Sequence, residues 1–145
     1  LNIYGRIKYD KDAVIDRIRN IVNASIYDEF IDYRKIHTIY NSNDVLILPY
    51  RQVTQCGPLL IGYSEGVPSI CSDLAGFREY VTDGVDSMIF DNTAAGLAAK
   101  MEEIIKNPAI IDKLSKGIEE IAMKKFSMEA LAGDYIENFK KCREG

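Results

Sequence analysis

Residues 44–58 read DVLILPYRQVTQCGP, and this stretch decides the fold that we expect. The apolar run at residues 45–48 is stopped by Pro49, and such a run is typical of a strand covered on both faces, as in a parallel sheet. A polar loop follows, and Pro58 favours the first turn of a helix, where no N–H is needed. The stretch therefore predicts a strand, a loop and a helix in direct succession.

The rest of the chain repeats this alternation up to residue 90 and then changes to helices only. Apolar periodicity predicts strands at 1–4, 25–31, 45–48, 68–71 and 87–90, and helices or helical turns at 10–22, 34–41, 58–65 and 77–81. Beyond residue 90, helices are predicted after caps at Asn92, Asn107 and Ser127. The alternation predicts an α/β fold, a Rossmann-like, doubly wound parallel sheet with helices on both faces, followed by C-terminal helices.

Composition narrows the classes of protein that remain. The chain has 145 residues, 47% hydrophobic and 28% charged, which is ordinary for a globular protein and predicts a single domain over residues 1–145. With 18 Lys and Arg against 22 Asp and Glu, the net charge is −4, so the chain is a poor candidate for binding nucleic acid. Its apolar runs are too short to cross a bilayer. Its three cysteines lack metal-like spacing and favour a reducing, cytoplasmic compartment.

The loop and helix start at residues 51–58 form the candidate site. The unpaired N–H groups of a helix start attract anions, and the helix dipole adds to this attraction. Gly57 allows a ligand to approach the backbone closely, and Arg51 could add positive charge. A phosphate or pyrophosphate is the expected ligand. The alternative is that Gly57 only serves the turn and that Arg51 is only solvated.

Further segments follow this stretch in a set order. They are GVPSI at residues 66–70, GFREYVTDG at 76–84, and Phe126-Ser127 before the last predicted helix. Together with DVLILPY at 44–50, they closely resemble the donor-binding domain of family 4 glycosyltransferases, which are retaining enzymes of the GT-B fold with nucleotide-sugar donors. The resemblance runs from residue 1 to about residue 140. It implies the C-terminal half of a GT-B hexosyltransferase that transfers a sugar from a nucleotide-sugar to an acceptor glycan or lipid.

The resemblance also implies roles for individual residues. It places the donor diphosphate at Gln55, Cys56 and Gly57, with Gln55 as a candidate sugar contact. It assigns no catalytic residue, and it requires no metal or other cofactor, because the nucleotide-sugar is a substrate. Further candidates in the donor loops are Arg51, Thr54, Gly76 and Glu79. We expect Glu79 to brace its loop by hydrogen bonds to the backbone rather than to act in catalysis.

The nucleobase and ribose are expected at the loop after the strand at 25–31. Ile31, Asp32 and Tyr33 occupy that loop. Backbone groups make most of the nucleobase contacts in the family. The alternative for Tyr33 is an aromatic loop residue without a ligand.

The chain departs from the family pattern in the helix that follows Gly57. Many members carry a Glu, seven residues and a second Glu here, and the two positions fall on Val53 and Ile61. Pro58 also removes one N–H that could have bound a phosphate oxygen. Two further hypotheses therefore stay open: a non-catalytic sugar- or partner-binding module with a decayed donor site, and a non-hydrolysing nucleotide-sugar epimerase.

Compared with the family's domain, the chain lacks the first strand and helix, and the acceptor-binding N-terminal domain is also missing. We therefore expect a fragment that is inactive alone, from a protein that could associate peripherally with a membrane. The strand at 1–4 would have lost its inner neighbour, and unpaired backbone groups inside a sheet are costly. Either upstream residues complete the sheet, or the remaining strands close up or pair with another chain by strand exchange or in a dimer.

Overall fold

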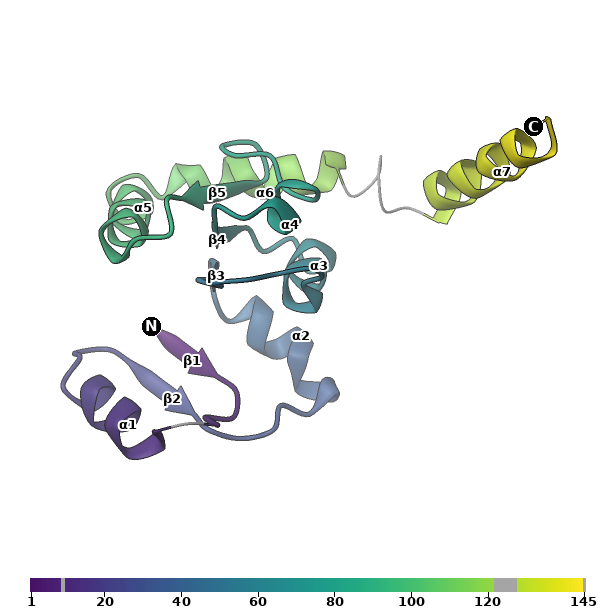
Figure 1. Cartoon of the computed structure of the whole chain (residues 1–145). Helices are drawn as coiled ribbons and strands as arrows, with labels where there is room; N and C mark the ends of the chain where they lie inside the picture. The colour runs from purple at the N-terminus through teal and green to yellow at the C-terminus, as the bar shows by residue number, and fades with distance from the viewer. Residues whose placement is uncertain (9, 122–127, 145) are drawn as a thin grey trace. The chain divides into compact units, whose positions relative to one another are not determined.

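The computed structural model describes residues 1–8, 10–121 and 128–144. Contacts divide the chain into two compact units, Leu1–Ile39 (unit 1) and Tyr40–Gly145 (unit 2), and helix α2 (Tyr33–Asn41) spans the boundary (Figure 1). Each unit contains one parallel sheet among the described residues. The single domain, the closing up of the remaining strands, completion of the sheet by upstream residues and pairing with another chain stay predictions.

Unit 1 is a β–α–β segment. Strand β1 (Asn2–Tyr4) pairs in parallel with β2 (Ser25–Tyr27), and α1 (Lys11–Arg19) connects them. The rings of Tyr4 and Tyr27, which are partners in the ladder, stack with centroids 4.6 Å apart. This pairing of aromatic side chains across the ladder supports the register of a very short sheet.

Strand β2 ends four residues earlier than the predicted range 25–31 because Asp28 has partners in the segment that follows β1. Its carboxylate accepts a hydrogen bond from the N–H of Ile7 at 2.8 Å and forms an ion pair with Lys11. These bonds, the one from Lys11 first, hold the pKa of Asp28 below its usual value. The side chain thus closes the turn that follows β1 instead of extending β2.

Unit 2 contains the larger sheet. Strands β3 (Leu46–Leu48), β4 (Ser69–Ser72) and β5 (Ser87–Phe90) are parallel and lie in the order β3-β4-β5. Their register places matching apolar residues side by side on each face. One face carries Leu48, Cys71 and Ile89, and the other carries Ile70, Met88 and Phe90.

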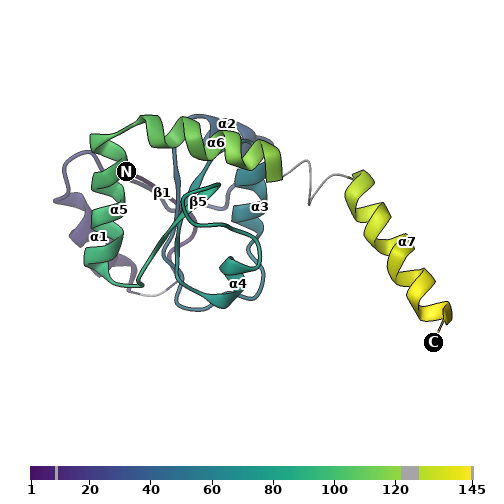
Figure 2. The same cartoon turned by 90° about the horizontal axis from the view of Figure 1, so that it is seen from above.

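Helices cover both faces of this sheet. The Leu48 face packs against α3 (Gly57–Ser64) and α4 (Ala75–Arg78), and the Ile70 face packs against α5 (Ala94–Lys106). Figures 1 and 2 show α3 and α5 on opposite sides of β5. The prediction of a two-sided parallel sheet is therefore confirmed for unit 2. Burying one such apolar side chain contributes about 1.5–3 kcal/mol.

Two further helices follow. Helix α6 (Ala109–Ile121) buries Leu114 against one core layer and Ile118 against the other. Helix α7 (Met128–Glu144) begins after residues 122–127, so the predicted cap at Ser127 and the Phe126-Ser127 motif lie outside the described residues. No helix among the described residues combines the length and apolarity needed to cross a bilayer.

Two local predictions need correction. The cap of α5 is Thr93 rather than Asn92, because the Thr93 hydroxyl accepts the N–H of Gly96 at 2.9 Å. Asn92 adopts a left-handed conformation with φ 64°, and its side chain donates to the carbonyl of Asp73 at 2.9 Å. Helix α4 begins two residues before the predicted range 77–81, since its first residue is Ala75.

We predict that Gly117→Ala destabilises unit 2. A Cβ added at Gly117 would lie 2.0 Å from the carbonyl oxygen of Val85, so α6 must shift away from the loop before β5. Such overpacking costs about 1–3 kcal/mol, which thermal and urea unfolding would detect. Gly133→Ala in α7 is the control, because its added Cβ meets nothing within 4 Å. Equal unfolding midpoints for the Gly117 variant and the parent chain would contradict the prediction.

Candidate functional site

The loops that follow β3, β4 and β5 lie together at the carboxyl edge of the sheet, where α/β folds bind ligands. The first two loops touch, since a Cβ added at Gly76 would lie 2.5 Å from the carbonyl oxygen of Val53. The second and third are joined by the hydrogen bond from Asn92 to Asp73. Gly76, in helix α4, thus serves the close approach of α4 to the loop after β3, which explains a glycine at this position.

Helix α3 begins at this edge with an open N-terminus. Its N-cap residue, Cys56, has extended backbone angles and no side-chain cap. Leu60 makes the first intrahelical bond, to the carbonyl of Cys56 at 3.3 Å. Among the described residues, no acceptor pairs with the N–H groups of Gly57 and Leu59, and Pro58 has no N–H. Two donors are therefore available to an anion.

The surface at Gly57 is open, whereas Leu59 is only 2% exposed. Gly57 is exposed, and a Cβ added to it would meet nothing within 4 Å. Two surface hollows are found elsewhere, beside α1 and beside α6, and neither is lined by a residue of the loop at 49–57. The helix start is therefore an open ledge rather than part of either hollow.

The N-terminus of α5 at the same edge is filled by the chain's own side chains. Thr93 caps it, and the Asp91 carboxylate accepts both the N–H and the hydroxyl of Thr93, at 3.1 and 2.7 Å. These bonds hold the pKa of Asp91 below its usual value. A carboxylate at this helix start repels a second anion, so α3, and not α5, offers an anion site.

Arg51 supplies a positive charge in the loop that leads to the start of α3. It is exposed and has no ion pair among the described residues. Arg78 at the neighbouring loop is occupied, because it binds the Asp73 carboxylate at 2.5 and 2.8 Å. The side chains of Thr54 and Gln55 are exposed. The loop thus combines one cation, two polar side chains and free N–H groups.

The Cys56 thiol lies on the other side of this loop, away from the open ledge. Cys56 is only 4% exposed and packs in the core layer with Leu59 and Phe77. Beside it, Tyr40 donates to the carbonyl of Pro58 at 3.0 Å, and burial raises the pKa of Tyr40 to about 12. Cys56 therefore offers its backbone to the site, and its thiol serves packing.

The residues expected at the nucleobase lie in unit 1, at the start of α2. The Asp32 carboxylate accepts the N–H of Arg34 at 3.0 Å and pairs with its guanidinium at 2.6 Å, which keeps the pKa of Asp32 below its usual value. The same guanidinium lies 5.9 Å from the centre of the Tyr33 ring. Tyr33 is 78% exposed and Ile31 is half-buried, so the Tyr33 ring is open for stacking.

The expectation that Glu79 braces its loop turns out differently in the structure. Glu79 is exposed, and the hydrogen bond it makes uses its backbone N–H, to Ala75 at 3.2 Å. Its carboxylate does not brace the loop among the described residues. The two positions where the family pattern has Glu are apolar here: Val53 packs against the core layer, and Ile61 is half-buried. Among the described residues, no three His, Cys, Asp or Glu side chains converge as metal ligands do.

Sequence reasoning missed two contributors to the site. The N–H of Leu59 is one, and counting three residues into the helix from Cys56 would have found it. The carbonyl of Val53, against which Gly76 packs, is the other. No sequence signal identifies that contact, because it joins two loops in space.

Comparison with known proteins gives a family. Residues 1–107 match the family model described as glycosyl transferases group 1. An uncharacterized 41.2 kDa protein in the cps region of Klebsiella pneumoniae is 24% identical over 132 residues, which cover 89% of this chain and 36% of that protein. The chain thus spans little more than a third of the length of this relative.

Solved structures share the fold. Sucrose-phosphate synthase from Thermosynechococcus elongatus matches with a TM-score of 0.79 and 17% identity, over 99% of this chain and 38% of that one. Anabaena HepE in complex with UDP matches with a TM-score of 0.74 and 12% identity, over 97% of this chain and 40% of that one. The C-terminal domain of LpcC, a group 1 glycosyl transferase from Francisella tularensis, matches with a TM-score of 0.74 and 12% identity. The match covers 88% of this chain and 85% of that one. The fold is therefore that of the C-terminal half of GT-B glycosyltransferases.

We predict that Gly76→Ala disturbs the site through packing alone. The added Cβ would push on the Val53 carbonyl, which cannot move without the loop that leads to Gly57. A loss of about 1–3 kcal/mol in unfolding free energy is expected from urea titration. Gly57→Ala is the control for stability, since it adds a Cβ in open space. The idea fails if both variants unfold at the same urea concentration.

Proposed function

Because the chain belongs to the group 1 glycosyl transferases, we propose that it is the donor-binding domain of a retaining glycosyltransferase. In this proposal the domain holds a nucleotide-sugar, and the complete enzyme transfers a hexose to an acceptor glycan or lipid. The acceptor side belongs to a further domain, so the 145-residue chain alone is inactive. We place the enzyme in the cytoplasm, with peripheral association to a membrane where the acceptor is a lipid.

The open N-terminus of α3 is the observation that carries this proposal. The N–H groups of Gly57 and Leu59 lack acceptors among the described residues, and Arg51, in the loop that leads to them, has no ion pair among those residues. A diphosphate matches this set because it offers several charged oxygens to donors and dipole together. The HepE structures with UDP and with UDP-glucose support a nucleotide-sugar as the ligand class.

The proposed transfer explains why a diphosphate needs such donors. In the reaction, the bond between the sugar's anomeric carbon and the diphosphate oxygen breaks, and the acceptor hydroxyl forms a new bond to that carbon. The acceptor proton leaves with the nucleoside diphosphate. Negative charge grows on the leaving oxygens, and donors fixed in advance at α3 stabilise it without reorganising. No metal or other cofactor takes part in this scheme.

We propose that the nucleobase and ribose bind at Ile31, Asp32 and Tyr33. The Tyr33 ring, exposed and beside the Arg34 guanidinium, offers a flat surface for stacking. Asp32 is engaged with Arg34, so its carboxylate orients the start of α2 rather than offering a free charge. Base contacts are then left to backbone groups and to the aromatic face.

A non-catalytic module is the second candidate function, and Val53 and Ile61 favour it. Both are apolar, and Val53 packs against the core. Neither can make the carboxylate contacts to donor sugar and ribose that the family pattern implies. A module of this kind would bind the nucleotide part without activating the sugar. Assaying the full-length protein for hydrolysis of nucleotide-sugars separates enzyme from module.

Titration of the 15N-labelled chain with UDP tests donor binding. We expect the amide signals of Gln55, Cys56 and Gly57 to shift at millimolar UDP, and pyrophosphate to shift the same signals. The two anions share only the diphosphate, so common shifts locate it at α3. If neither anion moves these signals, the donor-binding proposal is wrong.

Two substitutions test the contribution of Arg51 to UDP binding, one at Arg51 and one at a control position. Arg51→Gln should weaken UDP about 5-fold, or about 1 kcal/mol, and this difference should shrink at high salt because the charge is exposed. Arg17→Gln, at an exposed arginine of α1, should leave the affinity unchanged. Equal affinities for the two variants would remove Arg51 from the site.

A further inference from the structure

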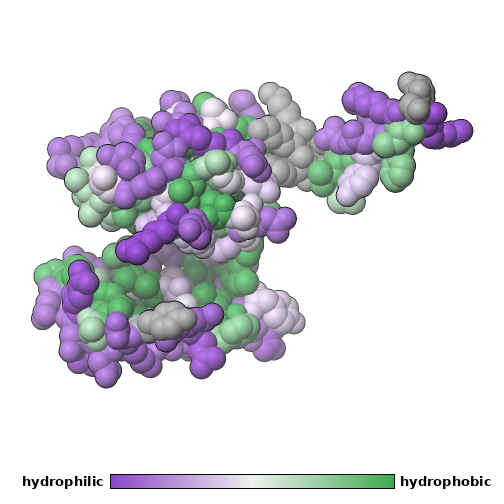
Figure 3. Space-filling view, in the orientation of Figure 1, coloured by the Kyte–Doolittle hydropathy of each residue, from purple (hydrophilic) through white to green (hydrophobic). Residues whose placement is uncertain are grey.

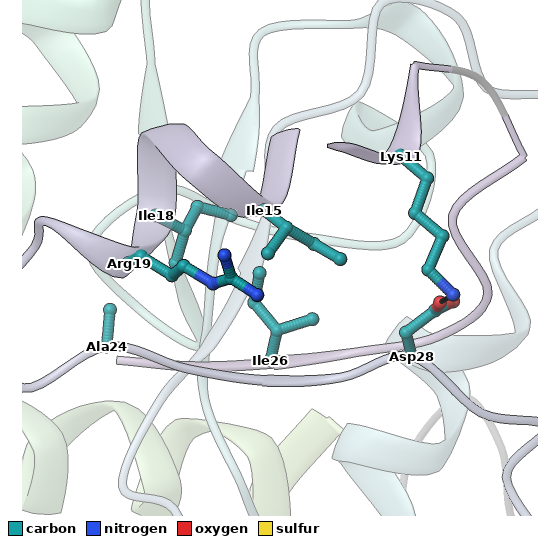
Figure 4. Close-up of a pocket in the computed structure, with 7 residues that line it drawn as sticks. All are labelled: Lys11, Ile15, Ile18, Arg19, Ala24, Ile26 and Asp28. Carbon is teal, nitrogen blue, oxygen red and sulfur yellow. Dashed lines mark ion pairs between the residues drawn. The ribbon is translucent and has the colours of Figure 1, made fainter. Parts of the chain in front are cut away.

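Many polar side chains of the chain lie at its surface, where they meet water or one another. Figure 3 shows hydrophilic residues spread over both units. In unit 1, Lys11 and Asp28 pair at the edge of a hollow of about 370 Å³ beside α1 (Figure 4). An ion pair with a side chain as exposed as that of Lys11 contributes at most about 1 kcal/mol. A tyrosine of unit 2 makes a different kind of contact, with the main chain of α3.

Tyr40 lies along α3 and ends at the first turn of this helix. A Cβ added at Gly62 would lie 3.7 Å from a ring carbon of Tyr40, so the ring passes over the position where Gly62 has no side chain. The Tyr40 hydroxyl donates to the carbonyl of Pro58 at 3.0 Å, about one turn closer to the helix N-terminus. All three residues belong to unit 2, so this contact is set within one unit.

The carbonyl that Tyr40 binds belongs to the same peptide group as a free N–H. The Pro58 carbonyl and the Leu59 N–H form one conjugated, planar group, so neither can turn without the other. This N–H has no acceptor among the described residues. The Pro58 ring restricts the backbone on one side of the peptide, and on the other side the Leu59 side chain packs in the core layer. The Tyr40 hydroxyl adds a hold on the oxygen itself.

The bond from Tyr40 also makes this N–H a better donor. A donor on the carbonyl oxygen draws electron density along the conjugated group, and hydrogen bonds in a chain strengthen one another by about 10–30% per bond. Burial raises the pKa of Tyr40 to about 12, so the hydroxyl keeps its proton at neutral pH and remains a donor. A carbonyl oxygen has two lone pairs, so the Tyr40 bond adds to the helix's own bonding.

We propose that Tyr40 is a positioning residue for the diphosphate: through the Pro58 carbonyl, it fixes and polarises the Leu59 N–H that donates to the anion. This inference rests on the proposed function, because it requires an anion at the N-terminus of α3. Tyr40 acts from behind the helix start and does not touch the ligand. Donors fixed in advance bind charge without reorganising, and Tyr40 supplies part of that fixation.

Titration of the 15N-labelled Tyr40→Phe variant with pyrophosphate tests the proposal. Phenylalanine keeps the ring beside Gly62 and removes only the hydroxyl. We expect pyrophosphate to bind about 3-fold more weakly than to the parent chain, measured from the shift of the Gly57 amide signal, because one donor loses its hold and its polarisation. Pyrophosphate has no base or sugar, so the measurement reports on the diphosphate site alone.

Tyr63→Phe is the matched control for a general loss of stability. Tyr63 lies in the same helix, and its hydroxyl also donates to a backbone carbonyl, that of Tyr80 at 3.4 Å. That carbonyl lies outside α3, so the affinity for pyrophosphate should equal that of the parent chain even where urea unfolds the variant earlier. Ser64→Ala is a second control at an exposed position, because it removes a hydroxyl that donates to the Ile61 carbonyl at 2.8 Å.

The amide signals of the ligand-free variant give a readout that packing alone would not move. Tyr40→Phe should shift the Leu59 signal, because the carbonyl of that peptide loses a hydrogen bond while the aromatic ring stays. The Gly57 signal is the internal reference, since its peptide carbonyl, that of Cys56, accepts from Leu60 at 3.3 Å and not from Tyr40. An unmoved Leu59 signal would reject the proposed polarisation.

The remaining outcomes separate this inference from the proposed function. Equal pyrophosphate affinities for Tyr40→Phe and the parent chain would reject Tyr40 as a positioning residue and leave the proposed function standing. Equal losses in Tyr40→Phe and in both control variants would trace the effect to stability and reject it as well. If pyrophosphate does not shift the Gly57 signal of the parent chain, the proposed function is wrong and this inference fails with it.

Discussion

The parallel ladder β3–β4–β5 carries an apolar layer on each of its faces, and the positions of the site's loops depend on it. Leu48, Cys71 and Ile89 share one face, so a slip of one residue in any strand would turn its apolar side chains toward the wrong layer. The register is therefore fixed, and with it the points where the loops leave the sheet. The Val53 carbonyl can then rest against Gly76.

Two helices begin at this edge and satisfy their first N–H groups in different ways. At α5, Thr93 and Asp91 supply the acceptors from the chain itself. At α3, the cap residue is Cys56, whose side chain is buried in the core and leaves the N–H groups of Gly57 and Leu59 without acceptors among the described residues. A buried cysteine at the cap thus serves the core and leaves the helix start available to a ligand.

The loop before α3 and α3 itself carry the strongest argument against a fully competent enzyme. Val53 packs against the core at one position where the family pattern implies a carboxylate, and the half-buried Ile61 of α3 stands at the other. In the proposed function, what remains at α3 is a site for a diphosphate, which every nucleoside-diphosphate donor shares. The proposed base site lies in unit 1.

The sequence by itself determined the fold class and the order of the elements, and it singled out the loop for which a diphosphate is proposed. These follow from apolar periodicity, from Pro49 as the end of a strand, from Pro58 as the start of a helix, and from the ordered motifs. All of these signals are local in the chain. It misplaced the cap of α5 and overextended β2, because Asn92 and Asp28 are committed to partners 19 and 21 residues away. Only the tertiary structure decided that the N-terminus of α3 is open whereas that of α5 is filled. Hydrogen-bond partners and burial depend on which segments meet in space, and a one-dimensional pattern does not record those meetings.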